Sequence, residues 1–159
     1  MKRIQLRSKE INQELVSYHY QTSKKDQLEL VETEDQKLKI VFVNKKPAFF
    51  YYQNKLLPTL RFLVENINNP ELKLLPQIIV DMGAIKFIIG GADIMRPGIK
   101  KIAENIHKDD VVIIIDETHH KPLALGLALF NAEEMMNMTS GKVIKNIHYV
   151  GDELWNFQL

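Results

Sequence analysis

The chain has 159 residues, enough for one or two small domains, and its composition of 45% hydrophobic and 26% charged residues is ordinary for a folded protein. It contains no cysteine, which excludes disulfides and thiolate metal sites. The N-terminal segment is too charged for a signal peptide, and no apolar run approaches the roughly 18 residues that span a bilayer. We therefore expect a soluble, cytoplasmic protein that makes no contact with membranes.

Charge and glycine are unevenly distributed along the chain. Residues 1–75 carry 13 Lys and Arg against 9 Asp and Glu, whereas residues 76–159 carry 8 against 11. All seven glycines lie at position 83 or later. This shift predicts two domains, residues 1–75 and residues 76–159, joined by a short and stiff segment between Pro70 and Pro76.

The helices of the N-terminal domain are predicted from apolar spacing and from capping residues. Ser8 is placed to cap a helix that carries Ile11, Leu15 and Tyr18 on one face. Pro58 suits the first turn of a second helix that ends near Asn66. The apolar positions at helical spacing in this second helix are Leu60, Leu63, Val64 and Ile67.

Three strands are predicted in the same domain, at residues 28–31, 38–43 and 48–52, with polar turns at 34–35 and 44–45. The third strand contains the aromatic run Phe49 to Tyr52. Adjacent residues of a strand point to opposite faces, so the run predicts core packing plus one outer pair of rings. Stacking on single-stranded RNA beside Lys45 and Lys46, or docking of a partner protein, is the functional alternative.

The C-terminal domain is predicted to be richer in strands, at residues 77–80, 93–95, 111–115, 122–130 and 143–149, with short helices at 82–89 and 132–138. Gly126 lies in the middle of one strand and indicates a bulge or a barrel bend. The run from Arg96 to Ile99 predicts a type II turn in which Gly98 takes a positive φ. Short strands punctuated by glycine predict a small barrel, and the chain as a whole is of the α+β class.

The spacing of the acidic and histidine residues gives little indication of a catalytic or metal-binding site. The acidic pairs at 109–110, 116–117 and 133–134 are sequence neighbours, which favours solvated turns and helix starts over a carboxylate dyad. The histidines lack the spacing of a metal pair, and no nucleophile elbow, phosphate loop or dinucleotide fingerprint occurs. We expect no catalytic residue, no metal and no cofactor.

The stretch from Val80 to Ile99 holds four of the seven glycines, and residues 86–101 carry four cations against Asp93 alone. The glycines serve either turns or the close approach of a ligand. For a ligand site, Gly90 and Gly91 are expected to leave their backbone N–H groups accessible, and Arg96 and Lys100 can pair with phosphates. The domain is otherwise acidic, so an RNA surface here is expected to be narrow.

The segments DMGAIKFIIGGADIMRPGI, VVIIIDETHHKPLALGLALF and GKVIKNIHYVGDELW resemble a PUA domain, an RNA-binding module. Together with LLPTLRFL upstream, they resemble the malignant T-cell-amplified-sequence family of translation factors and its archaeal relatives. The resemblance implies a small N-terminal domain followed by a pseudobarrel of about six strands. Animal members have cysteine at the position of Arg96, and arginine there adds a ligand for phosphate.

The resemblance also implies an RNA-binding site at the glycine-bearing helix and loop, the next strand and the last strand. The predicted RNA-binding residues are Lys86, Gly90, Gly91, Ala92, Asp93, Met95, Arg96, Pro97, Lys100, Lys145 and His148.

The implied function is non-catalytic RNA binding in translation, at a tRNA 3′ end or at ribosomal RNA. The family further implies the small ribosomal subunit and a protein partner, the latter through the N-terminal domain. An accessory RNA-binding subunit that acts with an RNA-modifying enzyme is the alternative.

Overall fold

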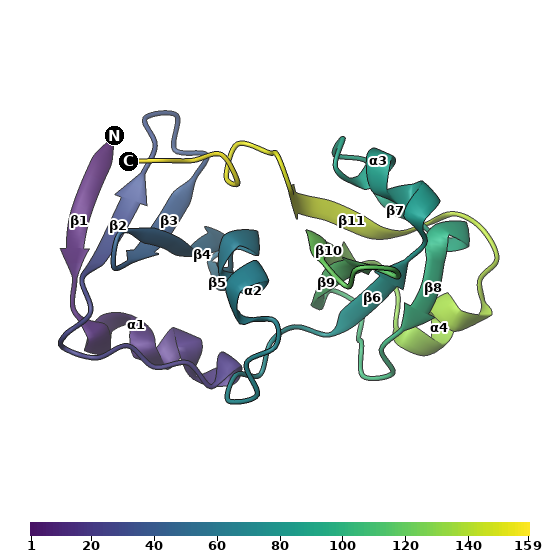
Figure 1. Ribbon diagram of the computed structural model, residues 1–159, viewed down its shortest axis with the longest axis horizontal. Coiled ribbons are helices and arrows are strands. Elements are labelled where there is room, and N and C mark those ends of the chain that lie inside the picture. The colour runs from purple at the N-terminus through teal and green to yellow at the C-terminus, as the bar shows by residue number, and fades with distance from the viewer. The chain divides into compact units, whose positions relative to one another are not determined.

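The computed structural model describes residues 1–159, which divide into two compact units, Met1–Leu74 and Leu75–Leu159 (Figure 1). The first unit is built on an antiparallel sheet whose five strands follow one another in chain order. They are β1 (Lys2–Leu6), β2 (Leu28–Glu32), β3 (Lys39–Val43), β4 (Lys46–Tyr52) and β5 (Lys55–Pro58). The helical elements are α1 (Ser8–Leu15), η1 (Val16–Tyr18) and α2 (Leu60–Asn66).

The three predicted strands of this unit are confirmed, and β1 and β5 are additions. The β3–β4 turn places Asn44 and Lys45 at φ of 51° and 69°, the two consecutive positive values that a tight hairpin needs. Gln53 and Asn54 do the same between β4 and β5. β1 escaped prediction because its side chains are almost all exposed, so it lacks the alternation of a half-buried strand.

The buried face of α1 is as predicted, but the start of the helix is not. Ile11 and Leu15 are buried, and Tyr18 is buried in the η1 turn that follows. Arg7 occupies the N-cap position, and no side chain caps the helix there. The predicted cap by Ser8 is therefore wrong.

The start of α2 also differs from the prediction. Pro58 ends strand β5, and Thr59 is the N-cap, with its hydroxyl accepting from the Phe62 N–H at 3.1 Å. Leu60 and Leu63 are buried as predicted, whereas Val64 is exposed.

The aromatic residues of β4 mostly fill the core. Phe49 is fully buried and its ring centroid lies 4.8 Å from that of Phe62 and 5.4 Å from that of Tyr20. Phe50, on the opposite face, is buried as well. Tyr51 and Tyr52 form the outer pair and are half-buried. The two phenylalanine rings are thus unavailable for stacking on RNA bases.

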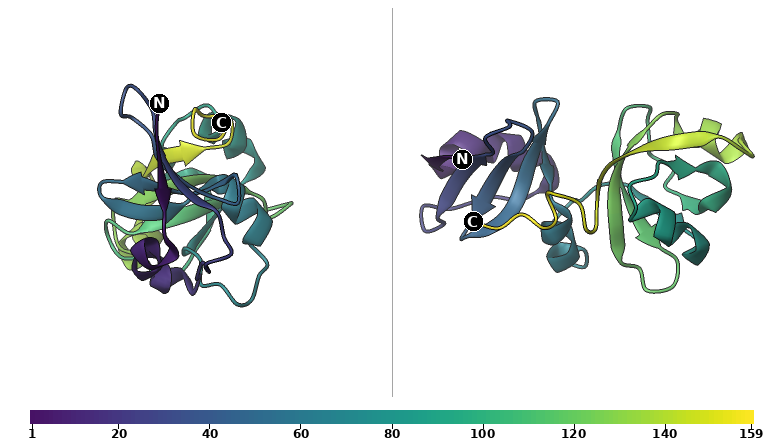
Figure 2. Two further views of the ribbon diagram at one scale, coloured as in Figure 1. Left: turned by 90° about the vertical axis from the view of Figure 1, so that its left-hand side faces the viewer. Right: turned by 90° about the horizontal axis from the view of Figure 1, so that it is seen from above.

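The second unit is a six-stranded sheet that curls into a half-barrel (Figure 2). Its strand order is β7 (Ile94–Met95), β11 (Lys142–Tyr149), β10 (Pro122–Ala128), β9 (Val111–Asp116), β6 (Gln77–Val80) and β8 (Ile99–Ile102). Only β6 and β9 are parallel neighbours. The helical elements are η2 (Met82–Ala84), α3 (Ile85–Ile88), η3 (Arg96–Gly98) and α4 (Ala132–Asn137). None of the helices is long and apolar enough to span a membrane.

Two glycine predictions have different outcomes in this unit. The bulge at Gly126 is confirmed, because the β10–β11 register shifts between Leu125 and Gly126, and a Cβ there would overlap Ile144. The type II turn at Gly98 is wrong. Residues Arg96–Gly98 form a 3-10 turn without positive φ, and a Cβ on Gly98 would lie 3.3 Å from that of Ala84. Close packing, not turn geometry, is what favours glycine there.

Asp116, at the end of β9, is fully buried, in contrast to the solvated turn predicted for it. Its carboxylate accepts the N–H groups of Thr118 and Lys121, each at 3.0 Å, and that of His119. Burial acts to raise the pKa of Asp116, but these backbone donors outweigh it and the pKa is lowered. The side chain therefore closes the β9–β10 turn as a carboxylate.

Candidate functional site

An open groove of about 760 Å³ lies along α3 in the second unit. It is lined by residues of η2 and α3, by the segments Ala92–Met95 and Pro97–Gly98, and by Asp81 and Lys142. The side chain of Phe87 is 59% exposed and that of Met95 50% exposed. An aromatic ring and a thioether left in water at one groove form the kind of apolar surface that marks a binding site.

Phe87 lies on the outward face of α3, a helix of four residues whose one buried residue is Ile88. Ile88 takes the inward position and is 2% exposed, so its neighbour Phe87 must point away from the core. Lys86 is exposed beside it, and its Nζ lies 5.1 Å from the centroid of the Phe87 ring. A cation at the face of an accessible ring suits a base and its phosphate.

The charged residues that line the groove are engaged with protein groups. Asp81 caps η2 by accepting the Ala84 N–H at 2.9 Å. Asp93 accepts the Asn146 N–H at 2.8 Å and pairs with Lys142 Nζ at 3.4 Å. The two carboxylates make the groove unfavourable for phosphate, and Lys142, the only lysine of the lining, offsets the charge of Asp93.

The glycine loop after α3 does not present free amides, contrary to the prediction. The Gly90 N–H donates to Phe87 O at 3.2 Å and the Gly91 N–H to Ile88 O at 3.0 Å. Gly91 has φ of +95°, and a Cβ there would lie 3.1 Å from the Tyr149 hydroxyl. The two glycines therefore fold the loop against Tyr149 and provide no anion-binding nest.

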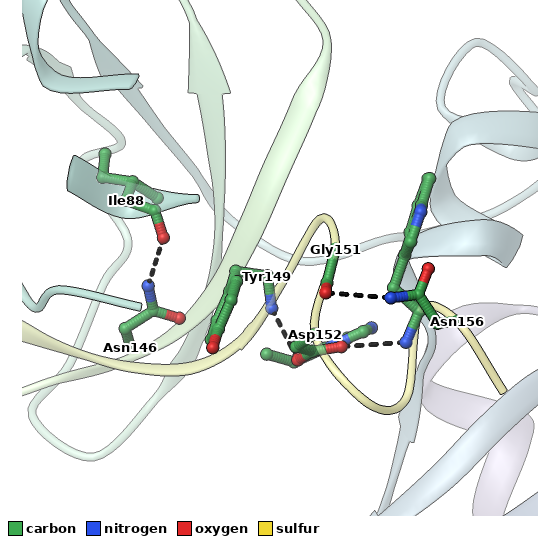
Figure 3. A network of polar contacts seen from close by, with 8 residues as sticks. Ile88, Asn146, Tyr149, Gly151, Asp152 and Asn156 are labelled. Atoms are coloured by element: carbon green, nitrogen blue, oxygen red, sulfur yellow. Dashed lines mark hydrogen bonds and ion pairs between the residues drawn. The ribbon is translucent and has the colours of Figure 1, made fainter. Parts of the chain in front are cut away.

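Asn146 on β11 holds this loop in place (Figure 3). Its Nδ2 donates to Ile88 O and to Ala92 O, both at 3.0 Å, while its backbone N–H holds Asp93. One side chain thus links the end of α3, the glycine loop and the last strand. The sequence gives no signal for this role, because Asn146 becomes the partner of the loop only through the folding of β11.

The guanidinium of Arg96 binds backbone carbonyl groups and does not line the groove along α3. Its Nε donates to Met135 O at 2.6 Å and its Nη1 to Ile99 O at 3.3 Å. Met135 lies in α4 and Ile99 begins β8, so the guanidinium joins two elements of the fold. The expectation of a guanidinium free to bind phosphate is not met.

His148 does not fit the predicted role of an RNA contact, since it is 1% exposed. Its Nδ1 lies 2.8 Å from Asp152 Oδ2. The same carboxylate accepts the N–H of Tyr149 (Figure 3) and that of Trp155. Burial acts to raise the pKa of Asp152, but the contacts with His148, Trp155 and Tyr149 lower it overall. This pair secures the turn after β11.

The predicted site residues are thus only partly brought together. Lys100 and Lys145 are exposed on β8 and β11, outside the groove lining, and Lys86 flanks it. Phe87 and Lys142 line the groove and were not predicted. The predicted residues that line the groove are Ala92, Asp93, Met95 and Pro97.

Comparison with known proteins shows which families the two units resemble. Residues 76–150 match the PUA domain model, and residues 3–66 match a domain of unknown function, DUF1947. An uncharacterised protein of Methanocaldococcus jannaschii is 45% identical over 135 residues, which are 85% of this chain and 79% of that protein.

Two further relatives carry informative names. Translation machinery-associated protein 20 of Saccharomyces cerevisiae is 36% identical, with 86% of this chain and 75% of that protein covered. Malignant T-cell-amplified sequence 1 of Rattus norvegicus is 33% identical, with 85% and 73% covered. The chain belongs to the malignant T-cell-amplified sequence family.

The fold of this family member is also found in a solved structure. The crystal structure of a hypothetical protein from Pyrococcus horikoshii superposes with a TM-score of 0.82 at 27% identity, covering 97% of this chain and 98% of that one. The predicted PUA pseudobarrel and the α+β class are confirmed. The groove along α3 therefore lies in a PUA domain, the RNA-binding module that the sequence resembled.

Proposed function

We propose that this protein binds the unpaired end of an RNA of the translation apparatus, with an unstacked base lying on Phe87 in the groove along α3. The exposed Phe87 ring carries this proposal. A strand end offers bases whose flat faces are free, and an aromatic side chain in water beside a lysine is the surface on which they stack. Met95 provides a second apolar contact within the same groove.

The charges of the groove favour a base inside it and phosphates at its edge. Asp81 and Asp93 would repel a phosphate, whereas their oxygens can accept from the exocyclic amino group of an adenine or cytosine. In this proposal Lys86, beside the Phe87 ring, and Lys142, which exchanges its ion pair with Asp93 for a phosphate, bind the flanking phosphates. Few cations take part, so the affinity should depend only moderately on salt.

The RNA that best fits these features is the 3′ end of a tRNA acceptor arm, or an unpaired end in ribosomal RNA. The yeast relative is named for its association with the translation machinery, and 86% of the present chain aligns with it. We extend the proposal to binding on the small ribosomal subunit and to a protein partner of the N-terminal unit. In this role the protein acts by binding and catalyses no reaction.

Phe87→Ala tests the proposal. Loss of one base-stacking contact should weaken binding to deacylated tRNA by about 1–3 kcal/mol, or roughly 5- to 150-fold, measured by fluorescence anisotropy. Because Phe87 is largely exposed, the melting temperature should barely change. Met136→Ala is the matched control, an exposed apolar side chain of α4 away from the groove, and should bind as the parent does. Equal affinities of parent and Phe87→Ala would refute the base-stacking site.

The RNA partner is tested with truncated tRNA and with ribosomal subunits. Removing the unpaired 3′ nucleotides from the tRNA should reduce binding at least as much as Phe87→Ala, and Phe87→Ala should weaken binding to the truncated tRNA little further. Co-sedimentation with small ribosomal subunits is expected. Co-purification with an RNA-modifying enzyme instead would favour the accessory-subunit alternative.

A further inference from the structure

A second groove, of about 770 Å³, lies in the first unit where the end of β1 meets the start of α1 and the segment 23–28. Three cations line it, namely Arg7, Lys9 and Lys24, against the single carboxylate of Asp26. Lys9 and Lys24 are exposed and form no ion pair, and Lys25 beside them is exposed as well. We refer to Arg7, Lys9 and Lys24 with the groove that they line as the basic groove.

The only carboxylate that lines the basic groove, that of Asp26, accepts hydrogen bonds from protein groups. Asp26 Oδ2 accepts the Ser23 N–H at 2.9 Å, and Oδ1 accepts Asn44 Nδ2 at 2.9 Å. These two donors lower the pKa of Asp26, so the side chain remains a carboxylate bound within its own loop. Its charge offsets one cation, but its oxygens are directed to the loop that carries Lys24.

The loop is held in one conformation. The Asp26 N–H donates to Ser23 O at 3.0 Å, and the Asn44 side chain also accepts the Gln27 N–H at 2.8 Å. On the other side, Arg7 Nε pairs with Glu10 Oε1 at 3.2 Å. The backbone that carries the cations is therefore organised before any ligand arrives, which reduces the entropy cost of binding.

The composition of the basic groove fits a phosphate chain better than a protein surface. The apolar residues that line it are Leu6 and Leu28, and Leu28 is only 2% exposed. Protein interfaces have aromatic and apolar residues at their centre, whereas phosphate contacts need lysine and arginine over a polar wall. The uncapped start of α1 at Arg7 adds a modest positive potential at one end.

We propose that the basic groove is a second RNA contact, in which Lys9 and Lys24 each bind a backbone phosphate. The inference rests on the proposed RNA-binding function and adds to it a site in the DUF1947 unit, independent of the groove along α3. Bases take no part in it, so the contact tolerates any RNA sequence. Its contribution falls as salt rises, whereas base stacking on Phe87 is much less sensitive to salt.

The double variant Lys9→Ala/Lys24→Ala of the full chain tests the inference, with a 20-nucleotide oligouridylate as probe. Two lost phosphate contacts to a single strand should reduce the salt slope of log K by about 1.4 and the affinity at 0.1 M salt by about 25-fold. The control is Lys55→Ala/Lys73→Ala, which removes the same charge from exposed positions of the same unit outside the basic groove. It should leave the slope within a few tenths of the parent value.

The outcomes separate this inference from the proposed function. If the parent binds the probe, Phe87→Ala weakens binding, and Lys9→Ala/Lys24→Ala changes neither slope nor affinity, the basic groove is not an RNA contact although the function stands. Equal losses in the test and control variants would show a general field effect and overturn the site. If the parent binds no RNA, both proposals fall. Capture of an acidic protein with unchanged RNA binding would assign the groove to a protein partner.

Discussion

Replacement of Arg96 by alanine should destabilise the protein and leave its RNA affinity nearly unchanged. The short Nε contact with Met135 O is a hydrogen bond from a charged donor, which contributes about 1.5–3 kcal/mol when well shielded. The Ile99 contact is longer at 3.3 Å, and the side chain is half-exposed, so we discount the total to about 1–2 kcal/mol. Both carbonyls can partly rehydrate in the variant.

The assay is urea denaturation followed by the fluorescence of Trp155, the only tryptophan of the chain. With a slope of roughly 2 kcal/mol per molar urea, the midpoint should fall by about 0.5–1 M. Affinity for deacylated tRNA, measured below the transition, should stay within about twofold, because the guanidinium does not line the groove.

Arg96→Lys is the informative companion variant. Lysine keeps the positive charge but lacks the planar guanidinium whose nitrogens reach both Met135 O and Ile99 O. The variant should therefore lose much of the stability that Arg96→Ala loses, while RNA binding is preserved. If Arg96→Ala keeps the parent's midpoint and loses RNA affinity that Arg96→Lys restores, then the guanidinium serves the ligand and the structural role is refuted.

Two further changes probe the polar contacts around β11. Asn146→Ala leaves Ala92 O without its side-chain donor and Ile88 O with the Gly91 N–H alone. It should cost about 1–3 kcal/mol of stability and speed hydrogen exchange at Gly90 and Gly91; unchanged exchange there would mean that Asn146 does not hold the loop. Asp152→Asn removes a carboxylate of lowered pKa, whose stabilisation is present above about pH 4 and is lost as the pH falls through the folded-state pKa. The variant should therefore be less stable than the parent at neutral pH, and the difference should shrink as the pH falls below about 4. Parallel pH profiles in acid denaturation would contradict this.

The local pattern of residue types was enough to predict many of the strands and turns of the fold. The β-branched run of β9 and the β-forming apolar residues of β2 to β4 predicted those strands, and turn residues predicted the hairpin at Asn44. Edge strands β1 and β8 were missed, since a strand with few buried side chains carries no apolar alternation. The helix starts were misplaced by one residue at Ser8 and by more at Pro58, because cap geometry depends on how the preceding strand ends.

The sequence predicted which region of the chain forms the candidate site, but not which residues of that region make the contacts. The glycines, the cations and the resemblance all indicated the stretch from Val80 to Ile99, and the groove along α3 is built from it. The residues of most interest there, Phe87 and Lys142, were not singled out. Phe87 and Lys142 are exposed because neighbouring residues are buried in the core instead. Which residues are buried is determined by the packing of the whole sheet.

By itself, the sequence determined the two-part organisation, the strand-rich second unit and its kinship with PUA domains, since these depend on composition, short periodicities and motif residues. Only the tertiary structure decided which polar groups are available to a ligand. Arg96, His148 and the amides of Gly90 and Gly91 were all predicted to contact RNA, and each is instead paired within the protein. A polar group must find a partner when the chain folds, and the identity of that partner is set by residues distant in sequence.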